Sequence, residues 1–278
     1  MNVEVSGRMV AKVGRAPVIE LRDVSKVHKT ARQMIRAVCG ANIRIEAGEF
    51  VSLLGPSGCG KSTLLGLVAG LDQPTSGTIT FDGLQRSTSD RRVAVNFQEP
   101  ALFPWRDTKR NVTIALENRG LGRAQVDAQA ERALEAVGLS QFQNIYPSHL
   151  SGGMKQRVML ARLLAMNAPV MLMDEPFAAL DAITREQMQD LVTRLYSARR
   201  FSIIFVTHSI EEALFASQRV IVMCARPGRI VHEVKLDEGY PRTFDWRLSD
   251  KVAALRRELH QLMRDLDAGG SGGEDARV

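Results

Sequence analysis

A glycine-rich run that ends in a lysine and two hydroxyl residues is the part of the sequence that most directly indicates chemistry. Glycines allow backbone N–H groups to converge on an anion, because a Cβ at those positions would block the approach. The helix that follows adds its positive N-terminal dipole, Lys61 adds a full charge, and the Ser62 hydroxyl can ligate Mg²⁺. The spacing GxxxxGK[ST] after an apolar strand therefore predicts a phosphate-binding loop, with Thr63 as a further phosphate contact. Its residues are Gly55, Pro56, Ser57, Gly58, Cys59, Gly60, Lys61, Ser62 and Thr63.

One of the three cysteines, Cys59, lies in the phosphate loop, and two interpretations of it are open. Cys59 fills a position that the motif leaves free, so it is either a small packing residue, which we favour, or a thiol of lowered pKa that bound nucleotide protects from alkylation. The chain has three cysteines, at 39, 59 and 224, with no CxxC pair. This pattern encodes neither a disulfide framework nor a zinc site, and it predicts a reducing compartment.

An acidic pair follows a second apolar strand. Asp174 and Glu175 come directly after residues 170–173, which read Val-Met-Leu-Met. At the carboxyl edge of a parallel sheet, beside a phosphate loop, Asp174 can hold Mg²⁺ through water. Glu175, one residue further, can polarise an attacking water and is the candidate general base. Without the phosphate loop, the same pair would be interpreted as a solvated turn.

The elements that position these residues are predicted from hydrophobic patterning. Short apolar runs at 50–54, 170–173, 203–206 and 220–223 predict buried parallel strands, joined by helices. Residues 18–24 and 78–82 alternate apolar and polar side chains, which predicts a small antiparallel sheet. Helical spacing at 124–137 and 158–165 predicts a helical insert between residues 111 and 166. An apolar stripe of Leu248, Val252, Leu255, Leu259, Leu262 and Leu266 predicts a further helix over about 250–266, packed on its own domain or, as the less favoured alternative, on a second copy.

Composition indicates an α/β protein and excludes disorder throughout. The 278 residues are 45% hydrophobic but only 5% aromatic, which suits a Val/Leu/Met-rich sheet buried on both faces. The net charge of +6 suits an anionic partner and equally suits a soluble protein without one. No run approaches the roughly 18 apolar residues needed to span a bilayer, and residues 1–10 contain no signal core, so we expect any membrane role to depend on a partner.

A second glycine motif separates families of phosphate-loop proteins. Residues 150–157 read LSGGMKQR and stand before a predicted helix, upstream of Asp174. In this order with the phosphate loop, Gln98, Asp174, Glu175, Asp181 and His208, the chain resembles the ATPase cassette of ABC proteins over about residues 18–234. The resemblance implies a P-loop NTPase fold with a parallel core sheet, an antiparallel β subdomain and a helical subdomain, and ATP and Mg²⁺ as cofactors. The domains expected are a flexible start at 1–16, an ATPase domain at 17–240 with its helical part at about 100–166, a helical extension at 241–266 and a disordered tail at 267–278.

The resemblance also implies roles for residues outside the phosphate loop. Ser151, Gly152 and Gly153 would close over the γ-phosphate held by another copy, so that ATP joins two cassettes; taken alone, Ser151 could be only a helix cap. Asp181 would couple the two sites. His208 would contact the γ-phosphate and orient water and Glu175, and Gln98 would sense Mg²⁺ and water.

Two positions depart from the family pattern. His28 stands where many cassettes stack an aromatic ring on adenine. Ser209 directly follows His208, at a position where an Asp is common in the family. Neither departure removes a group needed for phosphoryl chemistry. Base stacking would then be weaker or would come from the imidazole of His28, so we expect these departures to bear on nucleotide affinity more than on activity.

Three segments are similar to a narrower group, the ATPase subunits of bacterial nitrate, sulfonate and taurine importers. They are residues 97–106, 174–181 and 225–230. Trp105 lies where such cassettes receive the membrane subunit, so we expect an exposed docking anchor, with burial in the core as the alternative. The expected function is ATP hydrolysis that drives uptake of a small solute, on the cytoplasmic face of the bacterial inner membrane. The expected partners are a second cassette, permease subunits and, indirectly, a solute-binding protein.

Two other function classes fit less well. An ABC ATPase acting on nucleic acid or ribosomes would carry a long coiled-coil insert or two cassettes, and the chain has one phosphate loop and one LSGG segment. We therefore expect no nucleic-acid partner. A regulatory subunit without turnover would be favoured if Glu175 or His208 were missing, and both are present.

Overall fold

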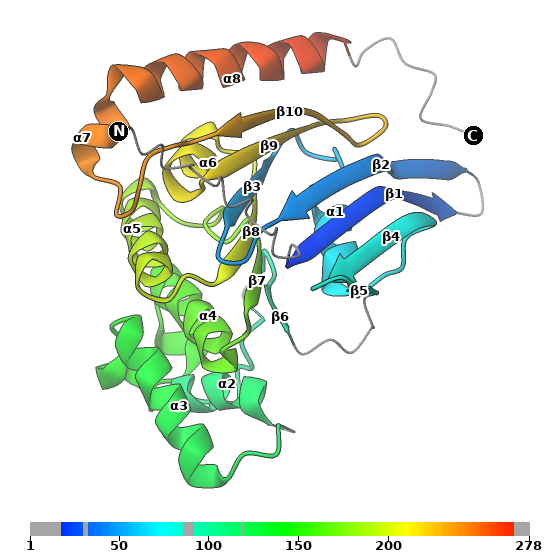
Figure 1. The fold of residues 1–278 in the computed structure, drawn as a ribbon. Coiled ribbons are helices and arrows are strands. Elements are labelled where there is room, and N and C mark those ends of the chain that lie inside the picture. The colour runs from blue at the N-terminus through cyan, green and yellow to red at the C-terminus, as the bar shows by residue number, and fades with distance from the viewer. Residues whose placement is uncertain (1–17, 30–32, 86–91, 100, 118, 270–278) are drawn as a thin grey trace, which may run out of the picture.

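An antiparallel sheet is built from the alternating strands near the N-terminus. The computed structural model describes residues 18–29, 33–85, 92–99, 101–117 and 119–269 (Figure 1). Four strands form this sheet in the order β2-β1-β4-β5, with β1 at Ile19–Lys29, β2 at Met34–Ile45, β4 at Ser76–Phe81 and β5 at Leu84–Gln85. Neighbouring strands are antiparallel, as the alternation predicts.

The second sheet carries the apolar runs. Its order is β10-β9-β3-β8-β7-β6, with β3 at Phe50–Leu54, β6 at Val93–Asn96, β7 at Val170–Asp174, β8 at Ser202–Thr207, β9 at Arg219–Cys224 and β10 at Arg229–Lys235. All pairs from β9 to β6 are parallel, and β3, β7 and β8 are buried along their whole length. The predicted α/β class and its four parallel strands are confirmed. The antiparallel edge strand β10 is additional to the sequence prediction.

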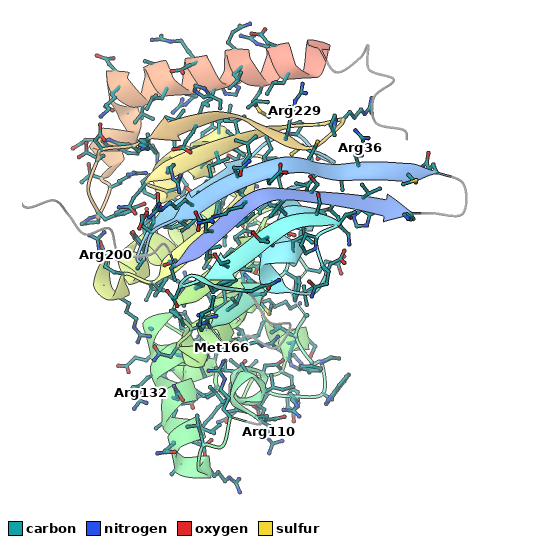
Figure 2. The ribbon with its side chains drawn as sticks, turned by 45° about the vertical axis from the view of Figure 1, so that its right-hand side comes forward. Arg36, Arg110, Arg132, Met166, Arg200 and Arg229 are labelled. Atoms are coloured by element: carbon teal, nitrogen blue, oxygen red, sulfur yellow. The ribbon has the colours of Figure 1, made fainter. Side chains whose placement is uncertain are left out.

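Helices fill the crossovers and form a separate lobe. Around the sheet lie α1 (Lys61–Ala69), α4 (Gly152–Met166), α5 (Ala182–Arg199) and α6 (Ile210–Ala216). The lobe contains α2 (Thr108–Thr113), α3 (Arg123–Ala136) and the short 3-10 turns Ile114–Leu116, Ser140–Phe142 and Pro147–His149, and α4 packs on it (Figure 1). Figure 2 shows Arg110 and Arg132 on this lobe, away from Arg36 of β2 and Arg229 of β10. The predicted helical insert is present, and α4 begins well before the predicted residue 158.

The C-terminal extension packs on the same chain. It consists of α7 (Phe244–Leu248) and α8 (Asp250–Gly269). Val252 and Leu259 of α8 are buried in a cluster with Leu54 of β3 and Ile210 of α6, which confirms the favoured packing. Leu248 was expected in the apolar stripe, but its exposed fraction is 65%, because the chain bends at Ser249 between the two helices.

The predicted tail begins too early, since α8 continues through residues 267–269 to Gly269. Helix is compatible with Asp267 and Ala268, and the glycine pair that follows favours its end. Residues 270–278 and the start at 1–17 lie outside the described residues. The division into domains at 17 and 241 stays a prediction. None of the helices that the structure describes combines the length and the apolar character needed to cross a membrane.

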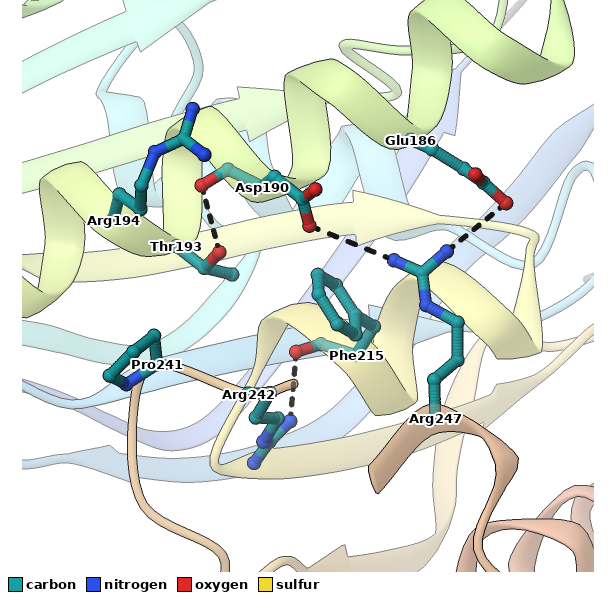
Figure 3. A pocket seen from close by; sticks show the side chains of 8 residues that line it. All are labelled: Glu186, Asp190, Thr193, Arg194, Phe215, Pro241, Arg242 and Arg247. Atoms are coloured by element: carbon teal, nitrogen blue, oxygen red, sulfur yellow. Dashed lines mark hydrogen bonds and ion pairs between the residues drawn. The ribbon is translucent and has the colours of Figure 1, made fainter. Parts of the chain in front are cut away.

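Two arginines fix the extension to α5 and α6, around an open pocket of about 230 Å³ (Figure 3). The Arg247 guanidinium lies 3.2 Å from a carboxylate oxygen of Glu186 and 4.0 Å from one of Asp190, both on α5. It also lies 3.9 Å from the ring centre of Phe215 on α6. Arg242 donates to the Phe215 carbonyl at 3.0 Å. The start of the extension is therefore held by charge and hydrogen bonds as well as by apolar burial.

Candidate active site

The phosphate loop lies between β3 and α1 and is pressed against neighbouring backbone. A Cβ at Gly55 would lie 2.5 Å from the Met223 carbonyl oxygen, and one at Gly60 would lie 2.3 Å from the Ala37 carbonyl oxygen. Gly60 also has a φ of 92°, which is in the left-handed region. These positions accept only glycine, so the spacing of the motif follows from the fold itself.

Positive charge is gathered at this loop without a balancing carboxylate on the helix. Lys61 is 5% exposed, and its Nζ donates to the carbonyl oxygens of Gly55 at 2.7 Å and Pro56 at 2.9 Å. The first turn of α1 has no acidic residue, and its N-cap, Gly60, has no side chain with which to cap it. Ser62 and the half-buried Thr63 add hydroxyls in this turn. The free N–H groups, the dipole and the ammonium together suit an anion as highly charged as a polyphosphate.

Cys59 is a packing residue in this loop. Its side chain is fully buried, and its Sγ lies 3.8 Å from Lys61 Nζ. Burial raises the pKa of the Cys59 thiol, against a smaller opposing effect of Lys61. The interpretation as a reactive thiol of lowered pKa is therefore wrong.

Asp174 and Ser62 meet across two elements. The Ser62 hydroxyl donates to Asp174 Oδ1 at 3.1 Å. Asp174 ends β7 and is 9% exposed, and burial raises the pKa of its carboxyl, while the bond from Ser62 lowers it. A buried carboxylate and a hydroxyl are hard oxygen ligands of the kind that Mg²⁺ prefers, so this donor set fits that ion.

Glu175 and His208 form the second polar pair of the site. Glu175 has a φ of 42°, in the left-handed region, and its backbone N–H donates to the Val206 carbonyl at 3.0 Å. Its Oε2 lies 3.1 Å from Nδ1 of His208. A non-glycine residue in this conformation stores strain, which is commonest at functional sites. The pair sets a carboxylate that can accept a proton beside an imidazole that can orient it.

The second glycine motif, residues 150–157, lies apart from the phosphate loop. Ser151 caps α4 by accepting from the Met154 N–H at 3.3 Å, and a Cβ on Gly153 would lie 2.5 Å from Thr184 Cγ2. Asp181 caps α5 and accepts from the Thr184 N–H at 3.0 Å and its hydroxyl at 2.7 Å. These bonds lower the pKa of the Asp181 carboxyl. The structure thus brings residues 151–153 and 181–184 together, and no hydrogen bond among the described residues joins residues 151–153 to the phosphate loop.

His28 and Gln98 are both exposed. His28 lies on β1 opposite Ile35 of β2. Gln98 follows the end of β6, where Asn96 pairs with Met173 in β7. Gln98 therefore comes just after the strand that neighbours the strand carrying Asp174.

One contact at the loop was missed at the sequence level. A Cβ at Gly228, in the turn between β9 and β10, would lie 2.2 Å from the Ala37 carbonyl oxygen and 2.3 Å from that of Cys59. The Gly228 carbonyl accepts from the Cys39 N–H at 2.8 Å. This turn clamps the phosphate loop to the antiparallel sheet. The only sequence signal was the similarity of residues 225–230 to importer ATPases, which gives Gly228 no role.

Trp105 is presented to solvent on a firmly held loop. It is 69% exposed, so the alternative of burial in the core is wrong. Asn111, fully buried, accepts from the Phe103 N–H at 2.8 Å and donates to the Arg106 carbonyl at 2.8 Å. Arg162 of α4 donates to Asn111 Oδ1 at 3.1 Å. The loop is therefore anchored to the helical lobe on both sides of Trp105.

Comparison with known proteins identifies a family that fits the observed fold and the phosphate loop. A family model described as ABC transporter matches residues 38–178, which is half of the chain. The chain belongs to the ABC transporter family. A nitrate import ATP-binding protein of Synechocystis is 42% identical over 255 residues, covering 86% of this chain and 95% of that protein. A taurine import ATP-binding protein of Jannaschia is 41% identical over 237 residues, covering 84% and 88%.

The fold is also similar to that of a solved ATP-binding cassette. The dimeric, post-hydrolysis structure of an ATP-binding cassette bound to ADP and Pi has a TM-score of 0.70 and 34% identity, and covers 80% of this chain and 100% of its own. The chain is an ATPase of this cassette fold, with ATP and Mg²⁺ as its cofactors.

Proposed function

We propose that the chain is the ATP-hydrolysing subunit of a bacterial importer for a small solute such as nitrate, a sulfonate or taurine. Two copies would work together on the cytoplasmic face of the inner membrane, beneath permease subunits. A solute-binding protein would deliver the solute to these permease subunits. The observation that carries the proposal is the convergence of Lys61, Ser62, Asp174, Glu175 and His208 at the carboxyl ends of β3, β7 and β8. The import names of relatives that span most of the chain support the transport role.

The phosphate loop would bind the triphosphate. Backbone N–H groups of residues 57–63, at the start of α1, would bind the phosphates, with Thr63 as a further contact and His28 near the base. Lys61 would exchange its two carbonyl acceptors for phosphate oxygens, since the ammonium gains more from a full charge than from neutral carbonyls. Ser62, Asp174 and Gln98 would hold Mg²⁺, which when bound neutralises charge on the β- and γ-phosphates.

Glu175 would act as the general base. Its carboxylate would accept a proton from the attacking water, and His208 would hold that carboxylate through the 3.1 Å contact while facing the γ-phosphate. The side chain of Glu175 is 17% exposed and that of His208 is 57% exposed, so both can be reached from the open side of the site.

A second copy would complete the site. Gly152 is exposed at the start of α4, and a Cβ there would meet no atom within 4 Å, so the N–H groups of residues 151–153 can be approached from outside. They would bind the γ-phosphate of the partner's nucleotide, as helix N-termini bind anions. Asp181 lies beside them through Thr184 and would couple the two sites. Loss of phosphate would then remove the charge that joins the copies, and the pair would open.

Trp105 would anchor the permease. A large aromatic side chain on a fixed loop is the usual form of an interface hot spot, because it buries area at little cost in conformational entropy. The Asn111 and Arg162 bonds supply the fixed loop.

The test of the transport role is Trp105→Ala in cells that depend on the chain. Uptake of labelled nitrate, taurine and an aliphatic sulfonate is measured, together with phosphate release by the purified variant. We expect uptake of one solute to fall at least about tenfold, while purified ATPase activity stays within about twofold of the wild type. Leu84→Ala is the matched control, since Leu84 is 67% exposed on β5. Equal loss of uptake and ATPase activity, or no loss of uptake, would contradict the docking role.

A further inference from the structure

A buried carboxylate beside His208 has no role in the chemistry proposed above. Glu212 lies in the first turn of α6 and is 5% exposed. Its Oε2 accepts from the Thr207 hydroxyl at 2.6 Å. Burial raises the pKa of Glu212, and the Thr207 bond is the largest effect opposing that rise. A carboxylate this buried is costly unless it is bonded, so its partners indicate what it is for.

Glu212 and Thr207 form an extended helix cap around His208. Ser209 is the N-cap of α6 and accepts from the Glu212 N–H at 3.3 Å, which is one half of a capping box. In the usual box the glutamate would accept from the N–H of the cap itself. Here the Ser209 N–H donates to the Thr207 hydroxyl at 3.0 Å, and that hydroxyl donates to Glu212. The hydroxyl thus fixes the backbone on both sides of His208.

Glu212 is also connected to the segment that carries Asp181. The Nε of Arg185 on α5 lies 3.7 Å from Glu212 Oε1, and its Nη2 donates to the Leu180 carbonyl at 2.9 Å. Leu180 immediately precedes Asp181, the N-cap of α5. A continuous path therefore runs from Thr207 through Glu212 and Arg185 to residues 180–181.

We propose that Thr207 and Glu212 are positioning residues for His208, and that Arg185 joins them to the Asp181 segment. The inference rests on the role proposed for His208. With the turn fixed, the imidazole is held 3.1 Å from Glu175 Oε2 although its side chain is 57% exposed. Without the Thr207 hydroxyl, the Ser209 N–H and the Glu212 carboxylate both lose a partner, and the turn samples other conformations. Turnover then falls with the fraction of molecules in which His208 faces Glu175.

The first experiment compares variants that remove one contact at a time. Thr207→Val keeps the shape and removes the hydroxyl, Thr207→Ser keeps the hydroxyl, and Glu212→Gln keeps an acceptor but no charge. We expect kcat for ATP to fall about tenfold, less than twofold and about threefold, respectively, with KM changed less than twofold in each. Glu135→Gln is the matched control, because Glu135 is exposed on α3 of the helical lobe. A rise in KM with kcat unchanged would overturn the proposal. Failure of Thr207→Ser to keep kcat near that of the wild type would also overturn it.

A double-mutant cycle with His208→Ala separates positioning from general damage. Release of labelled phosphate from γ-labelled ATP measures low turnover. If Thr207 acts through His208, Thr207→Val lowers kcat about tenfold in the wild type and less than twofold in the His208→Ala background. An equal loss in both backgrounds overturns the positioning role and leaves the proposed function intact. Wild-type turnover in His208→Ala itself would instead contradict the role of His208, on which the inference rests.

Discussion

Gly228→Ala tests whether the turn between β9 and β10 holds the phosphate loop in place. The added Cβ would lie 2.2 Å from the Ala37 carbonyl oxygen and 2.3 Å from the Cys59 carbonyl oxygen. Ordinary van der Waals contacts of a Cβ begin at 3.4 Å, so the turn and the loop must separate by about 1 Å. Overpacking of this kind costs about 2 kcal/mol. At this chain length, that free energy lowers the Tm by about 4 °C. Displacement of Cys59 also moves the N–H groups that precede Lys61, so we expect the KM for ATP to rise about fivefold.

The assay combines thermal unfolding without nucleotide with steady-state phosphate release over a range of ATP concentrations. Gly239→Ala is the control, because a Cβ at Gly239 would meet no atom within 4 Å. We expect that variant to match the wild type in Tm and KM. A Gly228→Ala protein with unchanged Tm and unchanged KM would refute the conclusion that the turn clamps the loop.

Three further predictions follow from burial and charge. Leu259 is fully buried, so Leu259→Ala should lower the free energy of unfolding by about 3 kcal/mol in urea titrations. Leu248 is 65% exposed, so Leu248→Ala should lower it by less than about 0.5 kcal/mol. Equal losses would show that α8 does not pack as described. Burial raises the pKa of Asp174 above its ordinary 3.8, so the folded state binds that proton more tightly than the unfolded state, and the ionised carboxylate lowers stability above pH 3.8. Asp174→Asn should therefore raise the Tm of the nucleotide-free protein at pH 7, with a gain that shrinks as the pH falls toward 4, and a lower Tm at pH 7 would contradict this sign. Iodoacetamide should label Cys39 and spare Cys59 in the native protein, with or without ATP, as read by peptide mass spectrometry, and fast labelling of Cys59 would contradict its burial.

The phosphate loop and the acidic pair were predictable because their signals are local. The loop is a continuous motif between a strand and a helix, and Asp174 ends a strand buried along its whole length. Parallel strands bring their carboxyl ends to one edge, so the meeting of Ser62 with Asp174 follows from the order of elements. The contact between Glu175 and His208 follows in the same way, from neighbouring strands β7 and β8.

Other features depend on tertiary contacts that no local pattern contains. Strand β10 lies at the sheet edge with only Val234 buried, so it lacks the continuous apolar run that marks the central strands. Leu248 fits the phase of one long helix, but Ser249 ends α7 and its hydroxyl faces the Val252 N–H at 3.4 Å at the start of α8. In the sequence, Glu212 resembles an ordinary exposed capping residue. In the structure it is buried, with its carboxylate bonded to the Thr207 hydroxyl and 3.7 Å from Arg185, which belongs to a different helix.

Glu175→Gln tests the central claim, that this site hydrolyses ATP with Glu175 as its base. The purified variant is assayed for phosphate release with Mg²⁺ and ATP, for ATP binding, and for its apparent size on a gel-filtration column with and without ATP. We predict that kcat falls at least about 100-fold, that ATP binding is retained, and that the variant runs as a dimer when ATP is present. Turnover equal to that of the wild type would contradict the assignment of the base and the mechanism built on it.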